Sequence, residues 1–420
     1  MKTILMLAMK SLRNRFIMVT LTVLSISLSL TLLLGVERFR TESHHSFTNT
    51  IAGVDLLVGA RSGPIQLLLY AVFHIGHATN NLSWQSYEEI KALPEVQWTI
   101  PISLGDSHRG YRVVGTTPAF FDHFTYGARQ PLSIERGDPF DDLYDAVIGA
   151  ETARRLGYEV GDTLVIAHGA GEVSFIEHGD KPFTVAGILA PTGTPVDRAV
   201  YVSLEAIEAI HIDWRGGAPL PGVSISADQA RRLDLTPRVI TAFMVKLKSP
   251  IATFTVQRFI NQYPAEPLTA ILPGVALQQL WELIGVAEKA LFAVSIFVVV
   301  VGLSGMLTAL LTSLNERRRE MAILRSVGAR PIHIFGLMIG EAVLVTSMGI
   351  ALGVALLYLM FIIAQPLLLS RLGLYLGISM VSPFEWLLIG LVWLAGLLVG
   401  IIPAWRIYRL ALMDGLSVRT

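Results

Sequence analysis

The sequence of 420 residues contains no cysteine, which excludes a disulfide framework, thiol catalysis and a lipid anchored on cysteine. It is also poor in charge, because Asp, Glu, Lys and Arg make up 16% of the residues against roughly 25% in soluble domains. The 33 basic and 33 acidic residues cancel, so no basic surplus indicates nucleic acid. No Gly-Lys pair occurs, which excludes the phosphate-binding loop of an ATPase. With 52% hydrophobic residues and a mean hydropathy of +0.56, the composition predicts a membrane protein.

Four apolar runs are long enough to cross a bilayer. Lys and Arg gather at one side of these runs, and an excess of basic residues in short loops marks the cytoplasmic side. We therefore predict four transmembrane helices with both termini in the cytoplasm. The predicted order is a cytoplasmic amphipathic helix (1–15), a first span (16–36), an extracytoplasmic domain (37–289), a second span (290–314), a cytoplasmic helix (315–331), a third span (332–365), a short outer loop (366–385), a fourth span (386–403) and a cytoplasmic tail (404–420).

The first apolar run has an alternative interpretation as a cleaved signal peptide. The run from Phe16 to Val36 has 21 residues without a charge, whereas the apolar core of a signal peptide usually has 7–15. It also continues into Glu37-Arg38-Phe39-Arg40 rather than into small residues. We therefore predict an uncleaved membrane helix.

The domain between the first two spans is predicted to be α+β. Short β-branched or aromatic runs such as Asp145–Gly149 and Pro182–Leu189 are bounded by Gly, Pro or Asp, which is typical of strands. Apolar residues at helical spacing at both ends of the domain indicate stalk helices that continue the membrane helices. The apolar strip from Ile65 to Phe73 is either an ordinary core element or a membrane-proximal flap that contacts an apolar cargo.

The cytoplasmic stretch from Asn315 to Pro331 carries the main functional hypothesis. As a helix it places Met321, Leu324 and Val327 on one side, and Gly328 provides a stop. A charged loop facing solvent is the alternative, but an exposed apolar row outside the membrane requires a partner that buries it.

The stretch Glu316-Arg-Arg-Arg-Glu-Met-Ala-Ile-Leu-Arg-Ser-Val-Gly-Ala329 resembles the coupling-helix signature of ABC permeases of the macrolide-exporter, lipoprotein-release and cell-division-permease superfamily. Val147-Ile-Gly149, Phe183–Gly187 and Pro403–Leu410 resemble the periplasmic domain and closing motif of the same superfamily, although Asp414-Gly-Leu416 departs from its usual ending. The resemblance implies a bacterial inner-membrane location and docking onto a cytosolic ABC ATPase dimer, which holds the ATP and Mg, with a second permease copy or paralogue and a possible periplasmic partner. No cofactor is implied in this chain. The implied ATPase-coupling residues are Glu316, Arg317, Arg319, Glu320, Met321, Leu324 and Arg325.

Glu341 is the single Asp, Glu, Lys or Arg between Ile332 and Gln365, and an ionisable group at membrane depth is a functional candidate. We expect it to lie near the cytoplasmic interface and to pair with Arg330 or His333. The superfamily resemblance favours a structural or coupling role for it over a proton relay.

Histidines are the only candidates for a metal site. Nine of the ten lie in the predicted outer part, but no His-Glu-x-x-His motif occurs, so we expect surface histidines and keep His74 and His77 as weak metal candidates. Asp55-Leu-Leu-Val-Gly-Ala60 and Gly193-Thr-Pro-Val-Asp-Arg198 resemble a branch of these permeases associated with zinc-responsive transport.

These observations together predict a permease subunit without enzyme activity of its own. It would transmit ATP hydrolysis by a separate ATPase to the extracytoplasmic domain, for export or extraction of a cargo such as a lipoprotein, a lipid or a drug. The alternatives are a permease of a zinc-handling system, a signalling permease that activates an extracytoplasmic hydrolase, and a stand-alone membrane enzyme, for which no catalytic constellation is found.

Overall fold

The computed structural model describes residues 15–48, 50–169, 178–215, 218–219, 225–326, 328–372 and 379–413. The chain divides into two compact units. One consists of residues 1–43, 284–370 and 376–420, and we call it the helical unit. The other consists of residues 44–283 with 371–375, and we call it the α+β domain. The predicted amphipathic helix over residues 1–15 lies outside the described residues except for Arg15.

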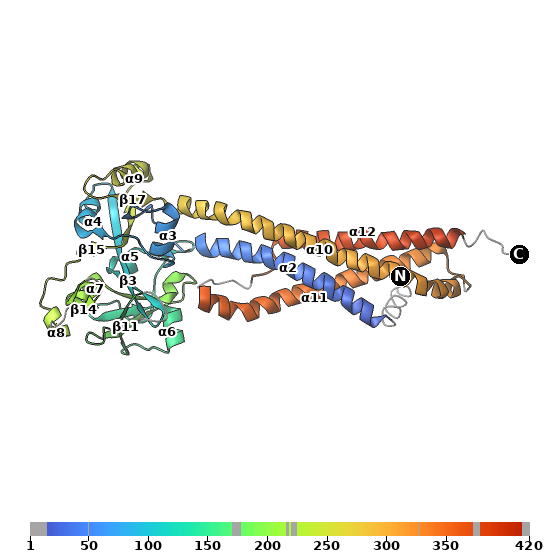
Figure 1. Ribbon diagram of the computed structural model, residues 1–420, viewed down its shortest axis with the longest axis horizontal. Helices are drawn as coiled ribbons and strands as arrows, with labels where there is room; N and C mark the ends of the chain where they lie inside the picture. Colours follow the sequence, from blue (N-terminus) through green and yellow to red (C-terminus); the bar gives the residue numbers. More distant parts are fainter. Residues whose placement is uncertain are drawn as a thin grey trace. The chain divides into compact units, whose positions relative to one another are not determined.

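Four long helices build the described part of the helical unit, in agreement with the predicted fold class. They are α2 (Phe16–Thr48), α10 (Pro273–Ser326), α11 (Pro331–Leu372) and α12 (Pro383–Met413), which run alongside one another in Figure 1. Each contains a stretch long and apolar enough to cross a membrane, at Phe16–His44, Pro273–Ser313, Pro331–Gln365 and Pro383–Arg406. Buried residues from all four helices, among them Leu30, Val299, Leu357 and Leu388, form a common apolar core.

Proline marks the start of three of these helices, since Pro273, Pro331 and Pro383 each begin one. Proline suits the first helical position because its fixed φ matches the helix and its missing N–H is not needed there. The predicted cytoplasmic helix 315–331 is not a separate element, because α10 continues without interruption to Ser326. No proline stands between Pro273 and Ser326, and Glu and Arg are good helix formers. Gly328, with a φ of +97°, lies between α10 and α11.

Small residues bring the helices close together at Gly349 and Gly353. A Cβ on Gly349 would lie 2.7 Å from the Ile26 side chain, and one on Gly353 would lie 2.9 Å from the Ser27 carbonyl oxygen. The Thr31 hydroxyl donates to the Gly353 carbonyl at 2.9 Å. Inside a bilayer the hydrophobic effect does not drive helices together, so close backbone packing and hydrogen bonds between helices stabilise their association.

The α+β domain is built on an 11-stranded mixed sheet. The strand order is β17-β1-β16-β3-β4-β12-β8-β11-β7, with β10 paired to β3 and β9 paired to β11. The strands are β1 (Leu56–Ala60), β3 (Val96–His108), β4 (Tyr111–Thr116), β7 (Ile134–Gly137), β8 (Asp145–Ile148), β9 (Thr163–Leu164), β10 (Ala167–His168), β11 (Phe183–Leu189), β12 (Ala199–Ser203), β16 (Ala242–Leu247) and β17 (Leu268–Ile271).

Strand β3 joins the two parts of this sheet. Its first half pairs antiparallel with β16, and its second half pairs antiparallel with β4. The register of the β3–β4 pair shifts between Leu104 and Ser107, where three steps along β3 correspond to two along β4, from Val114 to Arg112. One extra residue on one strand of an antiparallel pair is a β-bulge, which bends the strand.

Short helices and small paired strands complete this domain. The helices are α3 (Pro64–Val72), α4 (Trp84–Lys91), α5 (Ala119–His123), α6 (Ala150–Leu156), α7 (Leu204–His211), α8 (Ala227–Ala230) and α9 (Thr253–Asn261), with 3₁₀ turns η1 (Pro195–Arg198) and η2 (Pro250–Ala252). Three two-stranded pairs are β2 (Leu82–Ser83) with β15 (Val239–Ile240), β5 (Thr125–Tyr126) with β6 (Gln130–Pro131), and β13 (Trp214–Arg215) with β14 (Ala218–Pro219).

The apolar strip from Ile65 to Phe73 belongs to the core of the domain. Leu67 and Leu68 of α3 are fully buried against Leu57 and Ile100 of the sheet. The flap alternative is therefore wrong, because these side chains already pack against apolar partners within the domain. Local caps fix the ends of two short helices: the Ser203 hydroxyl accepts from the Ala206 amide at 3.0 Å at the start of α7, and Gly157 ends α6 with a φ of +72°.

Candidate functional site

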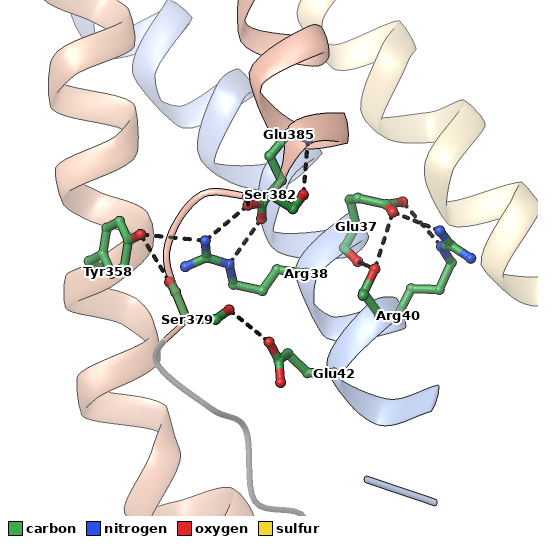
Figure 2. Close-up of polar contacts among 9 residues, drawn as sticks. Glu37, Arg38, Arg40, Glu42, Tyr358, Ser379, Ser382 and Glu385 are labelled. Carbon is green, nitrogen blue, oxygen red and sulfur yellow. Dashed lines mark hydrogen bonds and ion pairs between the residues drawn. The ribbon is translucent and has the colours of Figure 1, made fainter. Parts of the chain in front are cut away.

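A buried ion pair lies at one end of the helical unit, where the apolar run 16–36 ends and the run 386–403 begins. Arg38 of α2 donates from Nε to Glu385 Oε1 at 2.9 Å and from Nη2 to Glu385 Oε2 at 3.0 Å (Figure 2). The side chains are 2% and 4% exposed. Two parallel N–H···O bonds between a guanidinium and a carboxylate fix both groups in one orientation. The pair therefore ties α2 to the start of α12.

The local sequence of α12 places Glu385 at this position. In Ser382-Pro383-Phe384-Glu385, the Glu385 amide donates to the Ser382 hydroxyl at 3.2 Å, and the Ser382 amide donates to Glu385 Oε2 at 2.7 Å. This reciprocal pair is a capping box, which satisfies N–H groups that the first turn of a helix leaves free. The same carboxylate thus caps α12 and binds Arg38.

Aromatic and polar groups of α11 and of the segment before α12 surround the guanidinium. Arg38 Cζ lies 4.8 Å from the ring centroid of Tyr358 and 5.8 Å from that of Phe361, within reach of a cation–π interaction. The Tyr358 hydroxyl donates to the Ser379 carbonyl at 3.1 Å, and the Ser379 hydroxyl donates to Glu42 Oε1 at 2.8 Å. Figure 2 shows that three helices converge on Arg38.

A second pair, Glu37 with Arg40, stands beside this cluster on α2. Arg40 donates from Nη2 to Glu37 Oε1 at 2.6 Å and from Nε to Glu37 Oε2 at 3.1 Å. In the sequence, the charges from Glu37 to Arg40 argue only against a signal peptide. The sequence contains a signal for the buried ion pair, since charges directly follow the run 16–36 and Ser-Pro-x-Glu directly precedes the run 386–403. It does not show which of these charges pair.

Glu341 lies deeper in the helical unit and is fully buried. It lines a cavity of about 30 Å³ together with Arg15, Thr22, Met306 and Ser313, a volume that suffices for one water molecule. Arg15 Nη1 donates to the Ser313 carbonyl at 3.1 Å. Arg15 at the start of α2 therefore shares this cavity with Glu341.

Arg330 and His333, the partners expected for Glu341, are both exposed. The Arg330 amide lies 3.2 Å from His333 Nδ1, so the two residues contact each other at the start of α11. The basic residue that lines the Glu341 cavity is instead Arg15. Because Arg15 and Glu341 are far apart in the sequence, the residues next to Glu341 do not indicate this neighbour.

The predicted coupling segment is helical along its backbone up to Ser326, as the last part of α10. Its side chains lie outside the described residues, so Glu316, Arg317, Arg319, Glu320, Met321, Leu324 and Arg325 stay predictions. Val327 also lies outside the described residues. A continuous helix is the backbone conformation that the predicted apolar row requires.

The two predicted metal candidates lie just after α3. His74 adopts a φ of +57°, and burial together with the nearby Arg112 lowers its pKa to about 4. His77 is exposed and lines a pocket of about 430 Å³ with Arg112, Asn80 and Asn81. Neither belongs to the group of ligand-bearing side chains that converge elsewhere in the described part of the domain. The expectation of surface histidines is wrong for His178, which is fully buried.

The two aspartates of the zinc-branch motifs anchor loops. Asp55 Oδ2 accepts from the Leu247 amide at 2.8 Å, and Oδ1 accepts from Lys246 Nζ at 3.1 Å. Asp197 accepts from the Thr192 amide, the Thr192 hydroxyl and the Gly193 amide, each at 2.8 Å. Burial raises the pKa of Asp197, although these hydrogen bonds oppose that shift. Both motifs therefore have a structural explanation that involves no metal.

Replacing Asp197 with alanine is expected to destabilise the α+β domain by more than about 2 kcal/mol. The substitution leaves three partly buried donors of Thr192 and Gly193 without this acceptor, and each buried donor left unsatisfied costs about 1–3 kcal/mol. Chemical denaturation of the full-length protein, followed by tryptophan fluorescence, measures this loss. Asp234→Ala is the matched control, because Asp234 accepts from the amide and hydroxyl of Thr236 in an exposed turn. Equal losses for the two variants would contradict the anchoring role of Asp197.

Comparison with known families gives two matches that together cover most of the chain. Residues 17–263 match the model of the MacB-like periplasmic core domain. Residues 292–412 match the model of the FtsX-like permease C-terminal region. The first match spans α2 and the α+β domain as far as α9, and the second spans α11, α12 and most of the apolar part of α10.

Curated relatives include two proteins named macrolide export ATP-binding/permease protein MacB. The one from Shewanella oneidensis is 26% identical over 329 residues, which is 77% of this chain and 46% of the relative. The one from Shewanella sp. strain ANA-3 is 26% identical over 346 residues, which is 78% of this chain and 48% of the relative. The chain spans about half the length of these relatives.

Among solved structures, the periplasmic region of MacB from Actinobacillus actinomycetemcomitans aligns with 55% of this chain and 94% of its own, with a TM-score of 0.33 and 11% identity. The extracellular domain of the ABC-type transporter YknZ from Gram-positive bacteria aligns with 52% of this chain and 99% of its own, with a TM-score of 0.31 and 12% identity.

Proposed function

The chain belongs to the MacB-FtsX-like family of ABC permeases, and we propose that it couples ATP hydrolysis by a separate cytosolic ATPase to movement of its extracytoplasmic α+β domain. Family membership makes it a transporter component. The finer proposal concerns how the energy reaches the domain and what the domain then moves. We propose export or extraction of a cargo such as a lipoprotein, a lipid or a drug.

The observation that carries this proposal is the continuity of α10. One helix of 54 residues contains Leu277, which packs in the core of the α+β domain, and also the arginine-rich segment that ends at Ser326. At 1.5 Å per residue it is about 80 Å long, well beyond the roughly 30 Å of a hydrocarbon core. We propose that a displacement of its arginine-rich end along the helix axis is transmitted to the end that packs in the α+β domain.

α2 supports the same mechanism. It continues beyond the apolar run to Thr48, and the ring of His44 stacks on that of Trp281 of α10 at a centroid distance of 3.8 Å. α2 and α10 thus make a specific contact outside the apolar stretch 16–36. We propose that the two helices move together as a stalk.

The proposed topology places residues 315–331 in the cytoplasm and the α+β domain in the periplasm. The five arginines between Arg317 and Arg330 support this orientation through the positive-inside rule. Two such subunits, identical or paralogous, would sit on an ATPase dimer whose closure brings the two ends of α10 together. Arg317, Arg319 and Arg325 with Glu316 and Glu320 would surround the apolar contact of Met321 and Leu324.

Labelling of single cysteines tests the topology, and the absence of natural cysteine removes any background. Ser326→Cys is expected to react with a membrane-impermeant maleimide only in inverted inner-membrane vesicles. Gln85→Cys, on the exposed side of α4, is expected to react only in spheroplasts. In the same membranes, the cognate ABC ATPase should co-purify with the permease. Labelling of Ser326→Cys in spheroplasts, or a permease that never binds an ABC ATPase, would overturn the proposal.

A further inference from the structure

Four side chains that can bind a metal ion converge in the α+β domain, at positions far apart in the sequence. They are Asp106 of β3, His168 of β10, His178 shortly before β11, and His211 at the end of α7. Their nearest ligand atoms all lie within 4.8 Å of one another. Asp106 and His168 are direct neighbours across the antiparallel β3–β10 pair, so the sheet itself brings these two together.

Three distances between these ligand atoms match the tetrahedral coordination of a metal ion. His168 Nδ1 lies 3.1 Å from Asp106 Oδ1, His211 Nε2 lies 3.5 Å from the same oxygen, and the two histidine nitrogens lie 3.3 Å apart. Zinc bonds of about 2.0–2.1 Å in tetrahedral geometry place ligand atoms about 3.3 Å from one another. These three atoms therefore lie close to three corners of such a tetrahedron, and the distances between them are close to its edge length.

The environment of His211 orients its ring towards the group. His211 Nδ1 lies 2.9 Å from the carbonyl oxygen of Ile207, an acceptor, so Nδ1 carries the proton. The other ring nitrogen, Nε2, lies 3.5 Å from Asp106 Oδ1 and 3.3 Å from His168 Nδ1, so it points into the group. A histidine held by a backbone carbonyl through its other nitrogen is the usual arrangement of a metal ligand.

His178 supplies a second, independent observation. Its side chain is fully buried, and neither ring nitrogen has a hydrogen-bond partner in the described part of the chain. Burying a polar group without a partner is costly, and such groups in native proteins need an explanation. One of its nitrogens belongs to the group of atoms within 4.8 Å, so a bound metal ion explains it.

The scaffold around the group is itself buried and fixed. Lys181 Nζ lies 3.1 Å from Asp213 Oδ1, and this pair joins the segment of His178 to the segment of His211. The indole ring of Trp214 packs against the imidazole ring of His178, with 4.4 Å between the ring centroids. Rigid support of this kind holds metal ligands close to their bound geometry.

We propose that the α+β domain binds one divalent transition-metal ion of the zinc class through Asp106, His168, His178 and His211. Three imidazoles and one carboxylate suit zinc and neighbouring metals, whereas calcium and magnesium prefer oxygen ligands throughout. The inference stands on this geometry alone and is independent of the proposed transport mechanism. It assigns the metal to residues other than His74 and His77.

Zinc titration of the untagged full-length protein in lipid nanodiscs tests the proposal. After removal of metal with a chelator, isothermal titration calorimetry should show one saturable zinc site per chain. His168→Ala and His211→Ala are expected to weaken binding by more than about 100-fold, since loss even of an outer-shell partner costs 10–100-fold. Both side chains are partly exposed, so their replacement leaves the core packing intact.

His77→Ala is the matched control, because His77 is an exposed histidine of the same domain outside the group. It should bind zinc like the unmodified protein. X-ray absorption at the zinc edge should give a first shell of nitrogen and oxygen with the signature of several imidazoles. The absence of a saturable site in the unmodified protein, unchanged affinity in His168→Ala, or an equal loss in His77→Ala would each overturn the proposal.

Discussion

Glu385→Gln is expected to destabilise the full-length protein by about 3–5 kcal/mol, the usual result of removing one partner from a buried ion pair. Glutamine keeps the capping role at this position, because a capping box accepts Glu or Gln. What is lost is the negative charge beside Arg38, whose guanidinium is buried with Tyr358 and Phe361. Titration with SDS in mixed micelles, followed by circular dichroism, measures the free energy of unfolding.

A double variant distinguishes loss of the ion pair from a general effect of mutation. Arg38→Met/Glu385→Gln removes the unpaired cation as well, so it should be more stable than Glu385→Gln alone. Glu88→Gln is the surface control, since the Glu88–Lys91 pair is 44% and 48% exposed and such pairs contribute about 0–1 kcal/mol. A double variant less stable than both single variants would contradict the pairing.

Leu324→Asp is expected to weaken binding of the ATPase by at least about 30-fold. An apolar anchor in the centre of an interface contributes 2 kcal/mol or more, and each 1.4 kcal/mol corresponds to tenfold in affinity. The dissociation constant for the cognate ATPase on permease nanodiscs gives the direct readout. ATP hydrolysis stimulated by the permease should fall in parallel.

Ser326→Asp is the control for this substitution, because it adds the same charge two residues later on the same helix, at an exposed position. It should bind the ATPase nearly as well as the unmodified protein. Charge reversal in Glu320→Arg should give an intermediate loss, since a rim charge matters less than a buried anchor. Full binding by Leu324→Asp would show that the apolar row does not contact the ATPase.

The sequence predicts the helical unit well, and the reason is physical. The bilayer imposes a length and an apolar composition on each spanning helix, so runs such as 290–314 can be recognised without tertiary information. A local rule also predicts a helix stop at Gly328, and similar rules explain the end of α6 at Gly157 and the cap at Ser203. Each depends on backbone conformation and on the nearest neighbours in sequence.

The sequence predicts far less of what depends on long-range pairing. Arg38 and Glu385 are separated by 347 positions, and nothing in either neighbourhood selects the other. The group of Asp106 and three histidines also depends on long-range pairing. His178 and His211 come together because of the order of strands in the sheet, and no motif spacing in the sequence predicts it. The sequence predicts a separate helix over residues 315–331, whereas α10 continues to Ser326. No local signal shows whether a helix continues beyond the end of an apolar run.

The bulge in β3 absorbs one extra residue between Leu104 and Ser107 without exchanging the faces of the strand that follows. Leu104 and Ser107 lie opposite Val114 and Arg112, which are two residues apart and therefore share a face of the sheet. Asp106 thus reaches its neighbour His168 on β10 from a strand whose alternation is the same before and after the irregularity.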